Sequence, residues 1–85
     1  MKANAKDAML LNIIAAYLRL TRSGIDPKDV PVKMIMKQYG FLRVRNEKKK
    51  SEALFKTYQW ICYERFASGT SPAPSQMVAY LKKIW

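Results

Sequence analysis

The spacing of hydrophobic residues predicts a long first helix that is surrounded on most sides. In the segment 9–20 the only strongly polar residues are Asn12 and Arg19, which lie seven positions apart on one helical face. A helix that is apolar around the rest of its circumference is typical of the centre of a bundle. We expect it to begin at Asn4, whose side chain would cap the first turn, and to end at Gly24.

A short second helix is predicted after a proline-containing turn. Asp26 offers a cap, and Pro27 suits the first position of a helical turn because that position needs no N–H donor. Further on, Lys33 and Lys37 face outward, and Gly40 is expected to end the helix. The apolar stripe of this helix consists of Val32, Ile35, Met36 and Tyr39.

Two more helices are predicted in the second half of the chain. The third, at about 46–68, is the longest and is expected to end at Gly69. At 100° per residue, six of its side chains gather within about one third of the circumference and predict its core face: Leu54, Phe55, Tyr58, Ile61, Cys62 and Phe66. Ser75 is expected to cap the last helix. The stripe of that helix consists of Met77, Val78, Leu81, Ile84 and Trp85.

Both long helices end on similar residues. Aligning residues 20–40 with residues 65–85 matches four positions: Ser23 with Ser68, Gly24 with Gly69, Pro27 with Pro72, and Lys37 with Lys82. Convergence on common turn chemistry and duplication of a helical hairpin both explain these identities. We call the two helix ends, at Ser23-Gly24 and Ser68-Gly69, and the turns that follow them the Ser-Gly joints.

The elements together predict an all-α fold. A single domain, residues 1–85, would form a small bundle of four helices arranged as two αα-hairpins. The hairpins would occupy residues 4–40 and 46–85, joined by an extended basic connector at residues 41–45.

The connector differs from the helices in its hydrophobic period. From position 41 the period drops to two, as in an extended chain. This predicts that Leu42 and Val44 are buried while Arg43 and Arg45 are displayed to solvent.

Composition adds a question about apolar surface. The chain has 85 residues, of which 49% are hydrophobic, a large share for so small a core. The surplus either fills a well-packed bundle or belongs to a partner, including a second copy of the chain. The N-terminal segment imitates a signal peptide, but Asp7 and Asn12 interrupt the pattern and the apolar run is shorter than a membrane span. We therefore expect no membrane role and a cytoplasmic or nucleoid-associated protein.

The charge is strongly positive. There are 16 basic and 6 acidic residues, for a net charge of +10, which favours a polyanionic partner. The stretch 33–56 holds eight basic and two acidic residues. The run at 48–50 opposes the dipole of the helix that it begins, but lysines there suit phosphate binding. The predicted phosphate contacts are Lys33, Lys37, Arg43, Arg45, Lys48, Lys49, Lys50 and Lys56.

Two aromatic residues add to this prediction. Trp60 and Tyr63 share a helical face with Lys49 and Lys56, opposite the predicted core face. Either another helix covers Trp60, or the two rings form a surface that stacks on bases or anchors a protein partner. We include both in the candidate nucleic-acid-binding site.

No pattern in the chain indicates catalysis or a cofactor. There is no histidine, and the one cysteine, Cys62, is expected to face the interior, so no metal cluster, disulfide or nucleophile–base pair is expected. A helix–turn–helix is disfavoured because Asn46 and Lys49 fall where a recognition helix turns apolar residues inward.

Two functions follow from these residues. The first is a small non-enzymatic nucleic-acid-binding protein that contacts the phosphate backbone, alone or as a subunit of a nucleoprotein complex. The second is a basic helical interaction module, an inhibitor or adaptor, that binds an acidic surface of a larger protein. The sequence leaves open whether the nucleic acid is DNA or RNA and whether it is single- or double-stranded.

Overall fold

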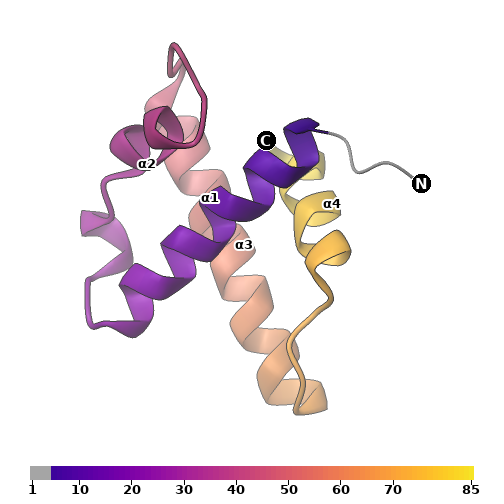
Figure 1. Cartoon of the computed structure of the whole chain (residues 1–85). Coiled ribbons are helices and arrows are strands. Elements are labelled where there is room, and N and C mark those ends of the chain that lie inside the picture. Colours follow the sequence, from indigo (N-terminus) through magenta and orange to yellow (C-terminus); the bar gives the residue numbers. More distant parts are fainter. Residues whose placement is uncertain (1–4) are drawn as a thin grey trace.

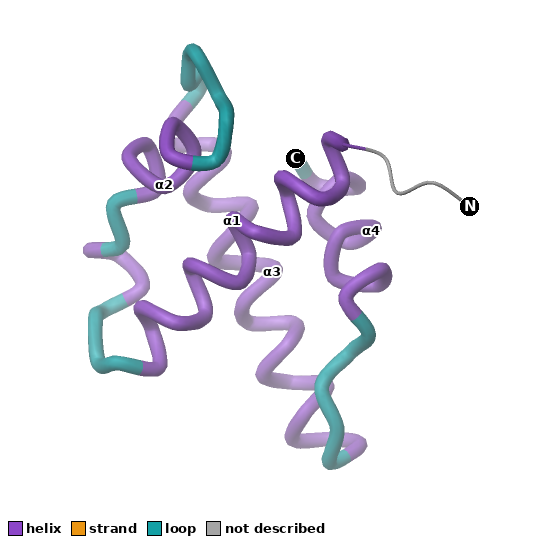
Figure 2. The backbone as a smooth tube through the Cα atoms, viewed as in Figure 1, coloured by secondary structure: helices purple, strands orange, loops and turns teal. Residues whose placement is uncertain are grey.

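The computed structural model describes residues 5–85, and all regular elements in that range are helices (Figures 1 and 2). They are α1 (Ala5–Arg22), the 3-10 helix η1 (Pro27–Asp29), α2 (Val32–Gln38), α3 (Glu47–Ser68) and α4 (Pro74–Ile84). The predicted all-α fold of four helices is confirmed. The predicted cap at Asn4 lies outside the described residues.

The four α-helices surround one interior. α1 crosses α3, and each of these two helices also contacts α2 and α4 (Figure 1). α2 and α4 therefore cover different ends of the α1–α3 pair. The C-terminal end of the chain returns to the start of α1, where Lys82 Nζ lies 3.0 Å from a carboxylate oxygen of Asp7.

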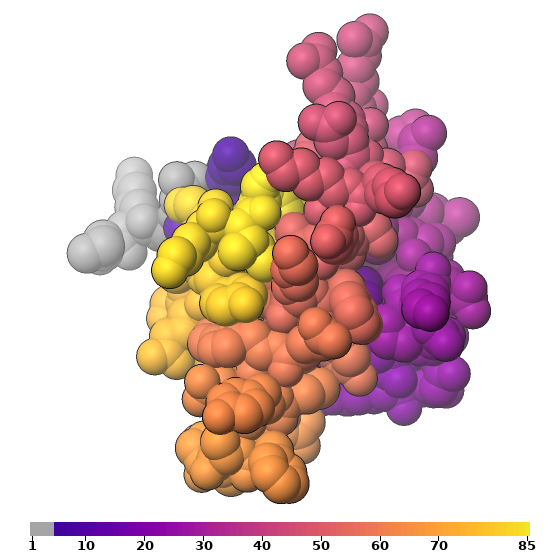
Figure 3. Space-filling model, turned by 180° about the vertical axis from the view of Figure 1, so that it is seen from behind, coloured from indigo at the N-terminus to yellow at the C-terminus, as the bar shows by residue number. Residues whose placement is uncertain are grey.

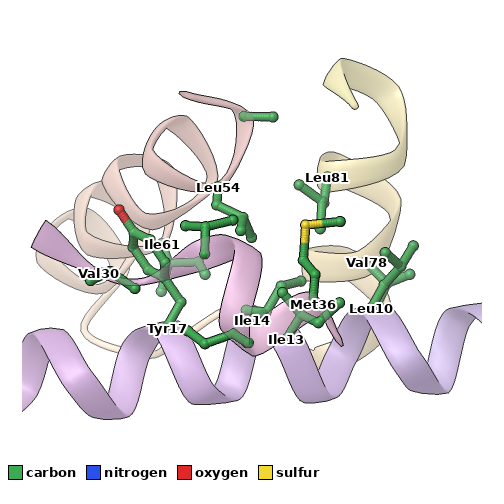
Figure 4. Close-up of a cluster of buried hydrophobic side chains, with 13 residues drawn as sticks. Leu10, Ile13, Ile14, Tyr17, Val30, Met36, Leu54, Ile61, Val78 and Leu81 are labelled. Atoms are coloured by element: carbon green, nitrogen blue, oxygen red, sulfur yellow. The ribbon is translucent and has the colours of Figure 1, made fainter. Parts of the chain in front are cut away.

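The core draws side chains from every α-helix. Figure 4 shows its aliphatic residues pointing into the shared interior. Its fully or nearly fully buried members include Leu10, Ile13, Ile14, Tyr17, Val32, Ile35, Met36, Leu54, Ile61, Val78 and Leu81. The one buried polar residue in the described range is Thr57, whose hydroxyl donates to the Ala53 carbonyl at 2.9 Å and so remains satisfied.

Tyr17 ties α1 to the turn that follows it. Its side chain is 2% exposed, and its hydroxyl donates to the Pro27 carbonyl at 3.3 Å. Burial, followed by the neighbouring Tyr58 and Asp26, raises the pKa of Tyr17 to about 12. The neutral phenol is thus the form that fits this site.

The two Ser-Gly joints end their helices as predicted but continue differently. Gly24 and Gly69 both have positive φ, at 104° and 79°. After the first, Asp26 accepts a hydrogen bond from the Lys28 amide at 2.9 Å, as expected of a cap. After the second, the prediction that Ser75 caps the last helix is wrong. That helix begins at Pro74, and the side chain of Gln76 accepts from the Ala73 amide at 3.0 Å.

The core face of α3 also differs from the prediction. Leu54 and Ile61 are buried, but Cys62 is exposed and Phe66 is 91% exposed. The face that meets the other helices is turned toward the small residues Ala53 and Thr57, which a search for large apolar side chains overlooks. The last turns of α3 also extend beyond α1 (Figure 1), in keeping with the exposure of Phe66.

Candidate nucleic-acid interface

The connector between α2 and α3 forms the projecting end of the molecule (Figure 1). We call residues 41–46 the connector tip. In the space-filling view, the chain near this segment rises above the surrounding surface (Figure 3). The tip follows Gly40, whose φ is 114° and where an added Cβ would lie 3.0 Å from Met9 Sδ. Glycine is therefore favoured by the positive φ, and a larger residue would also require the Met9 side chain to shift.

Two side chains hold the connector tip against the core. The ring of Phe41 lies 6.4 Å from that of Trp85, centroid to centroid, and Val44 is half-buried. Lys50 reaches over the same rings, its ammonium 5.8 Å from the centroid of Phe41 and 5.6 Å from that of Trp85. Such cation–π contacts stabilise a partly desolvated cation. Lys50, predicted to bind phosphate, therefore has a structural contact in this fold.

The prediction that Leu42 is buried is wrong. Its side chain is 94% exposed, whereas Val44 is half-buried as the alternation required. The backbone bends at Leu42, so the inward-facing positions are Phe41 and Val44, three apart rather than two. Phe41 takes the core position because it is the larger side chain and meets Trp85.

The predicted basic residues fall into two groups. Six of them are exposed and form no ion pair with any carboxylate of residues 5–85: Lys33, Lys37, Arg43, Arg45, Lys48 and Lys49. Lys50 has the ring contacts described above, and Lys56 pairs with Glu52 at 3.7 Å. The six unpaired cations lie on α2, on the connector tip and in the first turn of α3, which are consecutive along the chain.

The first turn of α3 lacks a side-chain cap. Asn46 occupies the N-cap position, but its side chain makes no cap hydrogen bond and its φ of 52° is left-handed. The first backbone bond joins the Lys50 amide to the Asn46 carbonyl at 3.0 Å. The N–H groups of residues 47–49 thus start the helix without a capping oxygen, beside Lys48 and Lys49.

Trp60 and Tyr63 do not join this group. Trp60 is half-buried, and its ring stacks on Tyr80 of α4 with centroids 4.5 Å apart and an interplanar angle of 2°. The structure therefore supports the interpretation in which a helix covers Trp60. Tyr63 is 66% exposed. Trp60 is ten positions after Lys50, about 15 Å along the helix axis.

A groove lies next to the start of α3. Its volume is about 620 Å³, and it separates Pro27 and Lys28 from α3. The α3 wall carries two glutamates, Glu47 and Glu52, beside Lys48. Its charges are nearly balanced, so this groove does not select anions. Within residues 5–85 there is no group of three or more potential metal ligands.

Comparison with known proteins adds no relative to this picture. No family model matches the chain, and neither a curated protein nor a solved structure resembles it significantly. None of the helices within residues 5–85 has the length and apolarity needed to cross a membrane.

Proposed function

We propose that this chain is a small non-enzymatic nucleic-acid-binding protein that contacts the phosphate backbone with the connector tip and the start of α3. One observation carries the proposal: six exposed cations without ion pairs follow one another from Lys33 to Lys49. A surface that serves only solubility usually intersperses charges of both signs, whereas the stretch 33–56 holds eight basic and two acidic residues. The mutual repulsion of these cations favours binding of a polyanion.

Arg43 and Arg45 are the central contacts of this proposal. Both project from a segment whose ends are held by Phe41 and by α3. Less conformational freedom is therefore lost when they bind. A guanidinium also grips a phosphate with two parallel hydrogen bonds, which a lysine cannot do.

The uncapped start of α3 supports the same role. Lys48 and Lys49 stand near the positive end of the helix dipole, where cations are unfavourable by a few tenths of a kcal/mol each. A phosphate at this place would accept from the free N–H groups and neutralise both lysines. The first turn of α3 should therefore be more stable with an anion bound.

The test is binding of labelled DNA and RNA, single- and double-stranded, followed by fluorescence anisotropy at two salt concentrations. If about five phosphates are contacted, affinity should fall roughly 10²–10³-fold between 50 mM and 200 mM salt, because counterions are released. We expect Arg43→Ala with Arg45→Ala to weaken binding at least tenfold, about 1.4 kcal/mol.

The matched control is Arg19→Ala with Arg22→Ala, in the last turn of α1. It removes the same charge from two exposed arginines at a distance from the connector tip. Equal losses from both pairs would show a diffuse charge effect and no defined site. Absence of binding to every nucleic acid would overturn the proposal.

A second candidate function rests on the far end of α3. Phe66 and Tyr63 are largely exposed there, as is typical of residues that anchor a protein partner. The chain would then act as an inhibitor or adaptor that binds an acidic surface of a larger protein. The anisotropy experiment separates the candidates, because this one predicts no nucleic-acid binding at physiological salt. In either role we expect the protein to work in the cytoplasm, and at the nucleoid if DNA is the ligand.

A further inference from the structure

Leu42 has an unusual place on the connector tip. It is 94% exposed, more than any other large hydrophobic side chain in the described range, and Arg43 and Arg45 follow it. A single exposed leucine is ordinary on a protein surface. A leucine at the apex of a projecting segment, next to two unpaired arginines, is a more specific arrangement.

The backbone under Leu42 is held in place. Gly40 and Phe41 fix one side of the bend, and Val44 is half-buried on the other. Because Phe41 and Val44 occupy the inward-facing positions, Leu42 stays outside the core although its side chain is apolar too. The connector tip therefore presents one apolar side chain on a restrained support.

Charge and shape together indicate the occupant. The surrounding cations call for a phosphate-bearing surface, and both a bilayer and a duplex supply one. A bilayer is bound best by a helical face with several apolar residues. The connector tip offers one such residue on a narrow projection (Figures 1 and 3), a shape that enters a groove. Duplex DNA is the better fit.

We propose that Leu42 is an apolar wedge that enters one base step of duplex DNA from the minor groove and kinks the helix there. This inference rests on the proposed function. Proteins that bend DNA insert leucine, phenylalanine or similar side chains in this way, and each insertion kinks the duplex by roughly 20–90°. Arg43 and Arg45 would hold the phosphates or the groove floor beside the wedge, where arginine is favoured.

The spacing of the connector tip suits this arrangement. Arg45 comes three positions after Leu42, which allows a reach of at most about 10 Å. Base pairs are stacked about 3.4 Å apart, so Arg45 would lie about three steps from the wedge. A-form RNA has a wide, shallow minor groove. We therefore expect DNA duplexes to be preferred over RNA duplexes, and flexible TA or CA steps over A-tracts.

The experiment measures bending and binding separately. A duplex about two turns long, ~20 base pairs with a central TA step, carries a donor and an acceptor dye at its ends. Saturating wild-type protein should bring the ends together and raise energy transfer. Leu42→Ser should abolish that rise but weaken binding by less than about tenfold, because the burial it loses is offset by the unstacking it avoids.

The matched control is Leu42→Met, which keeps an apolar side chain of similar volume and should bend DNA as the wild type does. Because Leu42 is exposed, both variants should melt at the wild-type temperature. Duplex binding without bending, or equal bending by Leu42→Ser, would overturn the wedge and leave the proposed function standing. Binding to single strands alone would have the same consequence.

Binding to lipid vesicles tests the remaining alternative, in which the connector tip binds a membrane. Phosphatidylcholine vesicles containing phosphatidylserine are offered to the wild-type protein and to Leu42→Ser. We expect the serine substitution to leave any vesicle binding unchanged. Vesicle binding that depends on Leu42, together with no bending of DNA, would make the connector tip a membrane anchor and overturn the wedge. Loss of binding to all nucleic acids would overturn the proposed function and the wedge together.

Discussion

The two ends of α3 differ in charge and in the apolar surface that they expose. The segment 43–50, which includes the N-terminal end, holds five basic and one acidic residue. The segment 57–68, which includes the C-terminal end, holds one of each sign and exposes the rings of Tyr63 and Phe66. One helix thus carries a charged end and an apolar end about 30 Å apart.

The ends also differ in how well they satisfy the backbone. At the C-terminal end, Gly69 takes a left-handed conformation and its amide donates to the Arg65 carbonyl at 2.8 Å. The hydroxyl of Ser68 donates to the Glu64 carbonyl at 2.7 Å. At the N-terminal end, Asn46 makes no cap bond, and two lysines oppose the helix dipole, which Glu47 offsets only in part.

Stability and the proposed binding function therefore fall at different ends of α3. A helix end that follows the capping rules needs no partner to be satisfied. The N-terminal end breaks those rules at several neighbouring positions, and the same positions carry the unpaired cations. Departures from local rules gather at functional sites because stability is given up there for binding.

The largest expected effect concerns stability, and it tests whether a covered and an exposed aromatic residue of α3 contribute differently to the free energy of unfolding. Trp60→Ala should lower the free energy of unfolding by about 2–3 kcal/mol, because a half-buried ring that stacks on Tyr80 loses less than a fully buried one. Phe66→Ala is the matched control and should change it by less than about 0.5 kcal/mol. Urea denaturation measures both, and similar losses would mean that the end of α3 is packed against something.

A smaller effect tests the N-terminal end. Lys48→Gln with Lys49→Glu should raise the free energy of unfolding by about 0.5–1 kcal/mol, because a cation is removed and an anion placed near the positive end of the dipole. Lys48 is changed to a neutral residue because Glu52 lies four positions after it. The new anion at position 49 lies three positions before Glu52, and this repulsion is included in the modest gain expected. The same variant should bind nucleic acid at least about tenfold more weakly.

Thermal melting and anisotropy measure the two outcomes on one protein. Lys48→Gln with Lys49→Gln is the control that removes both cations without adding an anion. A variant that melts lower than the wild type would show that the lysines stabilise the fold, and the trade of stability for binding would not hold.

The helices were predictable because their signals are local. The long apolar run of α1, the stripe of α2 and the positive-φ glycines at 24 and 69 depend on neighbours within a turn or two. The cap by Asp26 is equally local. The exposed arginines of the connector were also expected, since charged residues have no reason to leave water.

The rest depended on distant contacts. Phe41 displaces Leu42 from the core because Trp85, more than 40 positions later, is its neighbour. Trp60 is covered because Tyr80 stacks on it. The start of α4 is an exception, because the bond between Gln76 and the Ala73 amide is local and the sequence analysis chose Ser75 in its place. A single sequence does not say which helix lies opposite a given face.

We propose that nucleic acid binds at the N-terminal end of α3 and not at the C-terminal end. The most direct measurement is a titration of ¹⁵N-labelled protein with a short DNA duplex, followed by amide chemical shifts. We expect the largest shift changes in residues 33–50 and unchanged amides in residues 62–70. Changes centred on residues 62–70, or spread evenly over the chain, would contradict it.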